Sequence, residues 1–210
     1  MKRRRLRVVV TAGPTREHVD PVRYLSNESS GRMGFAIAAA AVEAGHQVTL
    51  IAGPVSLETP KGVRRVDVVS ARDMLRALRE HFPSADALFM AAAVADYRPR
   101  TRRRGKWKVK EAEGGEVQLP LIRNPDLLAS VARRKGPRTV VAFALETSDG
   151  PRRALAKLKA KNADYIVLND ASALNARSTS VRVLDGTGEV ARWTRRTKSM
   201  VARHLVRLLG

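Results

Sequence analysis

Short apolar runs rich in β-branched residues alternate with longer amphipathic segments along most of the chain. The run at residues 7–11 (RVVVT) is typical of a buried strand, because a strand covered on both faces is apolar at successive positions. Residues 71–82 instead place Met74, Leu75 and Leu78 at helical spacing. By the same two signals we expect further strands at residues 47–51, 63–69, 87–95, 139–144 and 165–168, and further helices at 31–44, after Pro125, 152–161 and 199–209.

This alternation predicts an α/β fold, in which a mainly parallel sheet is covered by helices on both faces. We expect residues 1–210 to form a single domain, since no repeat or low-complexity linker divides the chain. Two stretches depart from the alternation. Residues 106–110 and 117–122 are expected to pair as a β flap around a Gly-Gly pair, and residues 181–184 and 189–193 flank an Asp-Gly-Thr-Gly turn that is typical of a hairpin.

Composition excludes several kinds of site and narrows the choice of partners. Cysteine is absent, which excludes disulfides, thiolate metal sites and a cysteine nucleophile, and the four histidines lie too far apart to suggest a zinc site. The 40 basic and 20 acidic residues give a net charge of +20, which attracts nucleic acid, anionic lipid or phosphorylated small molecules. Apolar runs of about 18 residues and a signal-peptide core are both missing, so we predict a cytoplasmic protein without a membrane span.

Three common motifs of nucleotide-binding proteins and hydrolases are missing. The chain has no P-loop, and the turn after the first predicted strand reads AGPTR instead of G-x-G-x-x-G. No G-x-S-x-G elbow is present, which argues against a serine hydrolase. Two alternatives are kept open. An NAD(P)-dependent oxidoreductase is weakened by the missing fingerprint, and a nucleic-acid-binding protein by an aromatic content of 4% and the lack of a recognition motif.

A long polar loop precedes the helix that is predicted at residues 31–44. Ser29, Ser30 and Gly31 offer hydroxyl and backbone N–H donors at the start of this helix, and such donors suit an anion. Arg23 and Arg32 add positive charge. The alternative is a capped helix with a flexible entry loop that has no function. A polar loop of this length in a compact domain is more often functional.

Two further segments are candidate ligand contacts. The small residues of AAAVAD, at the end of the fourth predicted strand, allow a ligand to approach the backbone and place Asp96 at the edge of the site. Lys106, Lys108 and Lys110 would share one face of a strand and together neutralise a triphosphate. The alternatives are an ordinary small-residue strand and a solvated edge strand protected by lysines.

Taken in order, the segments TAGPTRE, DPVRYLSNESSGRMG, AAAVADYRP, KVKE, NPDLL, FALET and NDAS resemble the phosphopantothenate–cysteine ligase family over nearly the whole chain. The resemblance implies a Rossmann-like sheet with an added flap, and a homodimer whose flaps reach across the interface. It also implies that the carboxylate of 4'-phosphopantothenate attacks the α-phosphate of CTP and displaces pyrophosphate. The amine of L-cysteine then attacks the acyl-cytidylate and releases CMP. Because the reaction holds two polyanions together, Mg²⁺ and lysine side chains are expected to offset their negative charge.

The resemblance further implies roles for particular residues, while it identifies no metal ligand. Asn27 and Lys108 resemble the catalytic residues: Asn27 handles the acyl-nucleotide, with Arg23 and Ala93 lining it, and Lys108 acts in its formation. The residues that resemble nucleotide contacts are Met90, Ala91, Ala92, Asp96, Lys108, Asn124, Pro125, Asp126, Leu127, Phe143, Lys157 and Lys161.

The chain departs from the family pattern at two places. Pro14 stands where the family usually has glycine, and Glu111 replaces the last lysine of the K-x-K-K motif. The extra Lys106 leaves the register of that motif open, although the apolar residue after Lys108 favours Lys108. Some family members use ATP, so the choice of CTP also stays open. Nothing resembles the flavin-dependent half that precedes the ligase in many bacterial relatives. We therefore expect no flavin, and either a free-standing ligase or a domain of a longer chain.

Overall fold

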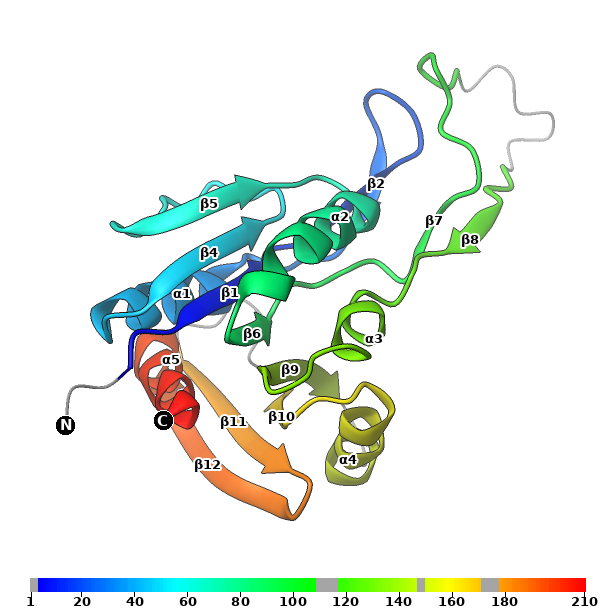
Figure 1. Ribbon diagram of the computed structural model, residues 1–210. Coiled ribbons are helices and arrows are strands. Elements are labelled where there is room, and N and C mark those ends of the chain that lie inside the picture. The colour runs from blue at the N-terminus through cyan, green and yellow to red at the C-terminus, as the bar shows by residue number, and fades with distance from the viewer. Residues whose placement is uncertain (1–3, 109–116, 147–149, 171–177) are drawn as a thin grey trace.

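A single mixed sheet forms the centre of the computed structural model, which describes residues 4–108, 117–146, 150–170 and 178–210 (Figure 1). Its strand order is β12-β11-β10-β9-β6-β1-β4-β5. The parallel strands are β1 (Arg7–Ala12), β4 (Gln47–Ala52), β5 (Val63–Asp67), β6 (Ala87–Met90), β9 (Thr139–Glu146) and β10 (Tyr165–Asp170). Across the sheet from β5 to β10, the six parallel strands are the third, second, first, fourth, fifth and sixth in the chain. This is the Rossmann-like order. The antiparallel hairpin of β11 (Ser178–Asp185) and β12 (Gly188–Thr197) extends the sheet beyond β10.

Helices cover both faces of this sheet, as Figure 1 shows. One face packs on α1 (Arg32–Glu43) and α5 (Lys198–Val206), which runs into a short 3₁₀ helix, η5 (Arg207–Leu209). The other face packs on α2 (Ala71–His81), η1 (Phe82–Ser84), α3 (Leu127–Ala132) and α4 (Gly150–Ala160). Successive strand residues point to opposite faces, so Val8 and Val10 join the first layer and Val9 the second. In the described ranges, each helix is too short or too polar to cross a membrane.

These elements confirm the predicted α/β fold and the C-terminal hairpin, and they correct two predicted boundaries. The strand expected at residues 87–95 ends at Met90. Beyond it the backbone N–H of Ala92 donates to Thr11 Oγ1 at 3.2 Å, so the chain turns out of the sheet. The strand expected at residues 63–69 also ends early, at Asp67. The helix expected after Pro125 is α3, which the side chain of Asp126 caps.

Two short hairpins extend beyond the sheet. The sequence predicted a flap near one of them but with the wrong strand pairing, and it did not predict the other. β2 (Arg16–His18) pairs with β3 (Tyr24–Ser26), and β7 (Tyr97–Pro99) pairs with β8 (Leu121–Arg123), both antiparallel. The flap strand expected at residues 106–110 is wrong for residues 106–108, which have irregular backbone, and its remainder lies outside the described residues. β8 therefore pairs with residues upstream of the lysines. We call residues 97–108 and 117–123 the arm, which projects from the sheet in Figure 1.

The fully buried carboxylate of Asp20 joins the β2–β3 hairpin to the arm. Its Oδ1 accepts the backbone N–H groups of Val22 and Arg23, each at 2.8 Å. Its Oδ2 accepts the backbone N–H of Trp107 at 3.1 Å and Arg23 Nε at 2.9 Å. Burial acts to raise the pKa of Asp20, but these hydrogen bonds outweigh it and hold the pKa well below its usual range. The ionised side chain of Asp20 thus anchors the arm, together with the hydrogen bond that the backbone N–H of Arg103 donates to Val19 O at 2.9 Å.

Close backbone contacts fix the loop that follows β1. Gly13 has φ of +78°, a conformation that favours glycine. A Cβ built on Gly53, which follows β4, would lie 1.8 Å from the carbonyl oxygen of Pro14. Only glycine therefore lets the end of β4 approach the loop after β1.

We predict that Gly53→Ala destabilises the fold by about 1–3 kcal/mol, because the backbone at Pro14 must move to admit the methyl group. Urea denaturation measures the change. Gly186→Ala is the matched control, since a Cβ there meets no atom within 4 Å, and it should stay within about 0.5 kcal/mol of the parent. Equal stability of the two variants would contradict the account.

Asp20 should also determine how stability falls in acid. Its folded pKa lies below the unfolded value of 3.8, so its stabilising effect is complete above that value and is lost as the pH falls further. Asp20→Asn should therefore be less stable at neutral pH but lose less stability than the parent between about pH 5 and pH 3. Denaturation curves across this range make the comparison. Asp67→Asn, at a carboxylate that is 70% exposed, should keep the parent's acid profile, and an unchanged profile in Asp20→Asn would refute the assignment.

Candidate functional site

The strand order reverses beside β1, since β4 lies on one side of it and β6 on the other. Ligands of open α/β sheets bind at such a point, outside the carboxyl ends of the strands. Here the loop after β1 is joined to the loop after β6. The backbone N–H of Ala93 donates to Gly13 O at 2.9 Å, and the backbone N–H of Ala95 donates to Thr15 Oγ1 at 3.0 Å. These bonds fix the backbone that borders the crevice.

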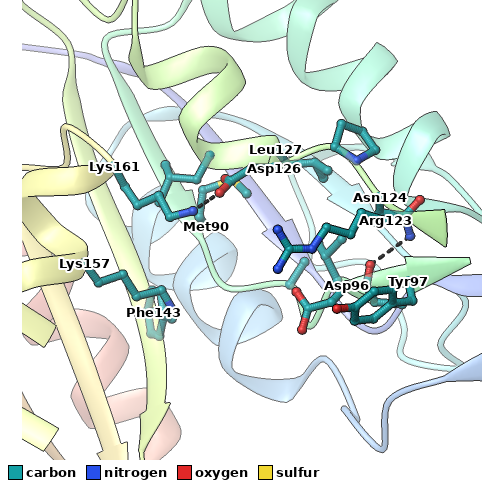
Figure 2. A pocket seen from close by; sticks show the side chains of 15 residues that line it. Met90, Asp96, Tyr97, Arg123, Asn124, Asp126, Leu127, Phe143, Lys157 and Lys161 are labelled. Carbon is teal, nitrogen blue, oxygen red and sulfur yellow. Dashed lines mark hydrogen bonds and ion pairs between the residues drawn. The ribbon is translucent and has the colours of Figure 1, made fainter. Parts of the chain in front are cut away.

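A cavity of 550 Å³ opens at this edge of the sheet, and we call it the first cavity. It collects residues from the end of β6, the start of α3, β9 and α4 (Figure 2). Of the predicted nucleotide contacts, it is lined by Met90, Ala92, Asp96, Asn124, Pro125, Asp126, Leu127, Phe143, Lys157 and Lys161. Residues far apart in sequence thus line one cavity.

Charged side chains stand on both sides of the first cavity. Figure 2 shows Lys157, Lys161 and Phe143 on one side, and Asp96 and Arg123 on the other. The two lysines are four residues apart on α4 and so share a helix face. The hydrogen bond to the side chain of Tyr97 raises the pKa of Arg123, and the nearby Asp96 carboxylate raises it further. Both walls therefore carry positive charge.

Hydrogen bonds hold the loop before α3 in place. Asn124 Nδ2 donates to Ala95 O at 2.8 Å, and Asn124 Oδ1 accepts from Arg98 Nη1 at 3.0 Å. Asp126 Oδ1 accepts the backbone N–H of Ala129 at 2.9 Å, while its other oxygen forms an ion pair with Lys161. Asn124 and Asp126 therefore shape the cavity wall, and their side chains are already engaged.

A second cavity of 370 Å³ adjoins the first. The two share Ala92, Val94, Asp96, Phe143 and Lys157, so they form one continuous space. The second cavity reaches the start of α1, where residues 29–34 line it, and includes the predicted contact Ala91. Gly31 precedes α1 with φ of +75° and has no side chain that caps the helix. The first N–H groups of α1 thus face the space predicted for an anion.

The predicted acyl-nucleotide residues are only partly brought together. Asn27 Nδ2 donates to Ala93 O at 2.9 Å, which places the predicted catalytic amide against the loop after β6. The guanidinium of Arg23 instead binds Asp20 and the carbonyl oxygen of Trp107, and it lines neither cavity. Arg23 therefore stands at the base of the arm in this structure.

Lys106 and Lys108 lie in the arm and line neither cavity, so the structure leaves the register of the lysine motif open. Several residues that do line the cavities were missed from the sequence. Val94, Ala95, Tyr97 and Arg123 flank predicted contacts, and their position beside those motifs was the available signal. Asn169 begins the NDAS segment, which was the available signal for it. Thr179 and Lys198 belong to the far end of the chain, and only the sheet topology brings them close. No group of three or more His, Asp or Glu residues suited to a metal occurs in the described ranges.

Comparison with known proteins identifies relatives of the whole domain. A family model described as DFP, the DNA/pantothenate metabolism flavoprotein C-terminal domain, matches residues 3–210. The coenzyme A biosynthesis bifunctional protein CoaBC of Vibrio parahaemolyticus is 43% identical over 189 residues, which cover 88% of this chain and 47% of that protein. The corresponding protein of Escherichia coli is 48% identical over 168 residues, which cover 80% of this chain and 41% of that protein. The chain thus spans less than half the length of these curated relatives.

The fold agrees with that relationship. The crystal structure of the C-terminal domain of a CoaBC protein superposes with a TM-score of 0.83 at 38% identity, covering 97% of this chain and 93% of that one. The family model spans the sheet, the hairpins and the residues that line both cavities. The chain therefore belongs to the family of the DNA/pantothenate metabolism flavoprotein C-terminal domain.

Proposed function

We propose that the chain joins 4'-phosphopantothenate to L-cysteine, with CTP as the co-substrate, in the synthesis of coenzyme A. The observation that carries the proposal is the pair of adjoining cavities, which are lined by all the predicted nucleotide contacts except Lys108 and lie beside Asn27 and Ala93. The names of the CoaBC relatives place those proteins in coenzyme A biosynthesis, and this chain matches the C-terminal domain of such a protein. Neither alternative has comparable support, since an oxidoreductase or a nucleic-acid-binding protein needs no such arrangement.

The nucleotide is proposed to occupy the first cavity and to extend toward the second. Backbone at residues 90–92 and the ring of Phe143 border the inner end of this space and suit a base. Lys157 lines both cavities and suits the phosphates, while Lys161 is partly neutralised by Asp126. Discrimination of CTP from ATP would rest on hydrogen bonds to the edge of the base.

Mg²⁺ is proposed to accompany the nucleotide, and the available oxygen atoms fit it. Asp96 lines both cavities, and the buried Asn169 Oδ1 beside the second has no hydrogen-bond partner in the part of the chain that the structure describes. A magnesium ion held mainly by phosphates needs only one or two protein oxygens, which agrees with the lack of a larger acidic cluster in the described ranges. When bound, the ion would offset the negative charge of the phosphates.

The reaction proposed has two displacement steps. A carboxylate oxygen of 4'-phosphopantothenate forms a bond to the α-phosphorus of CTP, and the bond to pyrophosphate breaks. The amine of cysteine then forms a bond to the acyl carbon and loses a proton. The bond from the acyl carbon to the oxygen that bridges it to phosphorus breaks, and CMP departs with that oxygen. Asn27 is proposed to orient the acyl group, with Arg23 and Ala93 beside it. A neutral amide at this position can donate a hydrogen bond without repelling an anionic intermediate.

The arm is proposed to complete the site of a second subunit in a homodimer. Lys108 lies in the arm and lines neither cavity of its own chain. Val22, Tyr24 and Tyr97 are exposed on the two hairpins, which suits a surface that meets a partner. In this arrangement Lys108 of one subunit would approach the nucleotide phosphates held by the other.

The direct test combines the protein with 4'-phosphopantothenate, L-cysteine, Mg²⁺ and CTP, and follows pyrophosphate, CMP and the ligated product. The proposal expects pyrophosphate only when the nucleotide and 4'-phosphopantothenate are both present. CMP release should depend on cysteine. Absence of pyrophosphate with both CTP and ATP would refute the ligase proposal. Activity with ATP alone would overturn only the choice of nucleotide.

Asn27→Asp is expected to form the acyl-cytidylate but to convert it to product about 100-fold more slowly. The change replaces the N–H donor that binds Ala93 O by a carboxylate that repels both this oxygen and an anionic intermediate. Quenched reactions analysed by mass spectrometry would show the intermediate accumulate. Asn162→Asp is the matched control, because it removes an equivalent bond from Nδ2 to Ala132 O, at 2.8 Å and away from both cavities. Full turnover in Asn27→Asp would remove Asn27 from its assigned role.

Comparing Lys106→Gln with Lys108→Gln resolves the register of the lysine motif. We expect Lys108→Gln to lower the rate of pyrophosphate release by about 100-fold, because it removes a cation from the phosphates, and Lys106→Gln to change it only slightly. Each variant serves as the control for the other, since both remove one charge from the same arm. The reverse pattern would show that Lys106 is the functional lysine.

A further inference from the structure

The C-terminal hairpin supplies one wall of the second cavity. Thr179 lies at the start of β11 and Lys198 at the start of α5, and both line the cavity together with residues 29–34. Because β11 runs antiparallel to β10, its first residues lie at the edge where the parallel strands end. β12 reverses direction again, so α5 also begins at this edge. The topology therefore brings the last elements of the chain to the proposed active site.

Thr179 presents a buried hydroxyl to which no described residue is hydrogen-bonded. The residue is 3% exposed, and Oγ1 has no hydrogen-bond partner within residues 4–108, 117–146, 150–170 and 178–210. The position is fixed, because Thr179 pairs with Arg196 in the β11–β12 ladder. Buried polar atoms are nearly always hydrogen-bonded, so an orphaned hydroxyl at a cavity wall indicates a group that arrives from the cavity.

Positive charge converges on the same space. Burial lowers the pKa of Lys198, and the positive charge of Arg32 lowers it further, so the two cations are close enough to repel each other. Within the ranges that the structure describes, no carboxylate forms an ion pair with Arg32 or Lys198. The first turns of α1 and α5 contain no acidic residue, and both helix N-termini add partial positive charge.

We propose that Thr179, Lys198 and Arg32, which all line the second cavity, bind a phosphate group of a substrate. The hydroxyl of Thr179 would donate one hydrogen bond, and the ammonium of Lys198 would donate a charge-assisted one. This inference rests on the proposed function for the identity of the phosphate. The continuity with the first cavity through Phe143 and Lys157 favours the terminal phosphates of the nucleotide, and the phosphate of 4'-phosphopantothenate is the other source.

Calorimetric titration with inorganic pyrophosphate, CTP and 4'-phosphopantothenate tests the site without requiring turnover. Lys198→Met should weaken binding of the phosphate source by about tenfold or more, and Thr179→Val by about threefold. Lys198→Arg should restore most of the affinity, because it keeps the charge. Arg203→Gln is the matched control, since it removes one exposed positive charge from the same helix. It should bind all three probes like the parent.

The three probes separate the possible sources. Weaker binding of pyrophosphate and CTP assigns the site to the nucleotide, and weaker binding of 4'-phosphopantothenate alone assigns it to that substrate. Unchanged binding of all three in Lys198→Met, or no binding of any by the parent, overturns the inference. If pyrophosphate binds through Lys198 but no ligase product forms, the anion site stands and the proposed function fails.

A stability measurement separates binding from a structural role for the hydroxyl. Thr179→Val removes an unpartnered polar atom and keeps the shape of the side chain, so the melting temperature of the free protein should not fall. The rise in melting temperature on adding pyrophosphate should be smaller than in the parent. A lower melting temperature with an unchanged pyrophosphate response would show a structural hydroxyl and contradict the proposal.

Discussion

The hydrogen bonds between the loop after β1 and the loop after β6 are the constraint on which the site depends. They hold residues 91–95, which line one or both cavities, against the loop after β1. The approach requires glycine at positions 13 and 53, since the first adopts a left-handed conformation and the second leaves no room for a Cβ. Asn27 binds the carbonyl oxygen of Ala93 on this same loop, so backbone packing also determines where the proposed catalytic amide lies.

The proposed site also depends on positive charge. The proposed reaction brings a triphosphate together with a phosphorylated carboxylic acid, and two polyanions meet only where cations offset their repulsion. The net charge of +20 produces a general attraction for anions, which accounts for steering but not for specificity. Specificity is proposed to arise from cations on different elements: Lys157 on α4, Arg32 on α1 and Lys198 on α5. Each is positioned by the packing of its helix against the sheet.

The order of strands and helices could be predicted from sequence because a parallel strand is buried on both faces and is therefore apolar at successive positions. The two short hairpins could not be predicted in this way. Asp20 joins one hairpin to the arm through Trp107, which is distant in the chain, and no local sequence pattern indicates such a bond. The cavity residues were predicted where a recognisable motif contained them. Thr179 and Lys198 were missed because their contribution follows from the antiparallel reversal of β11 and β12, which only the folded sheet shows.

The central claim is that a carboxylate is activated by forming a bond to the α-phosphorus of the nucleotide. Substrate labelled with oxygen-18 in the carboxylate of 4'-phosphopantothenate tests this step most directly, because the label records which bond forms and which breaks. If the chain acts as proposed, mass spectrometry will find one labelled oxygen in CMP, one in the amide of the product and none in pyrophosphate. Label in pyrophosphate or inorganic phosphate, or CMP without label, would contradict the acyl-cytidylate route.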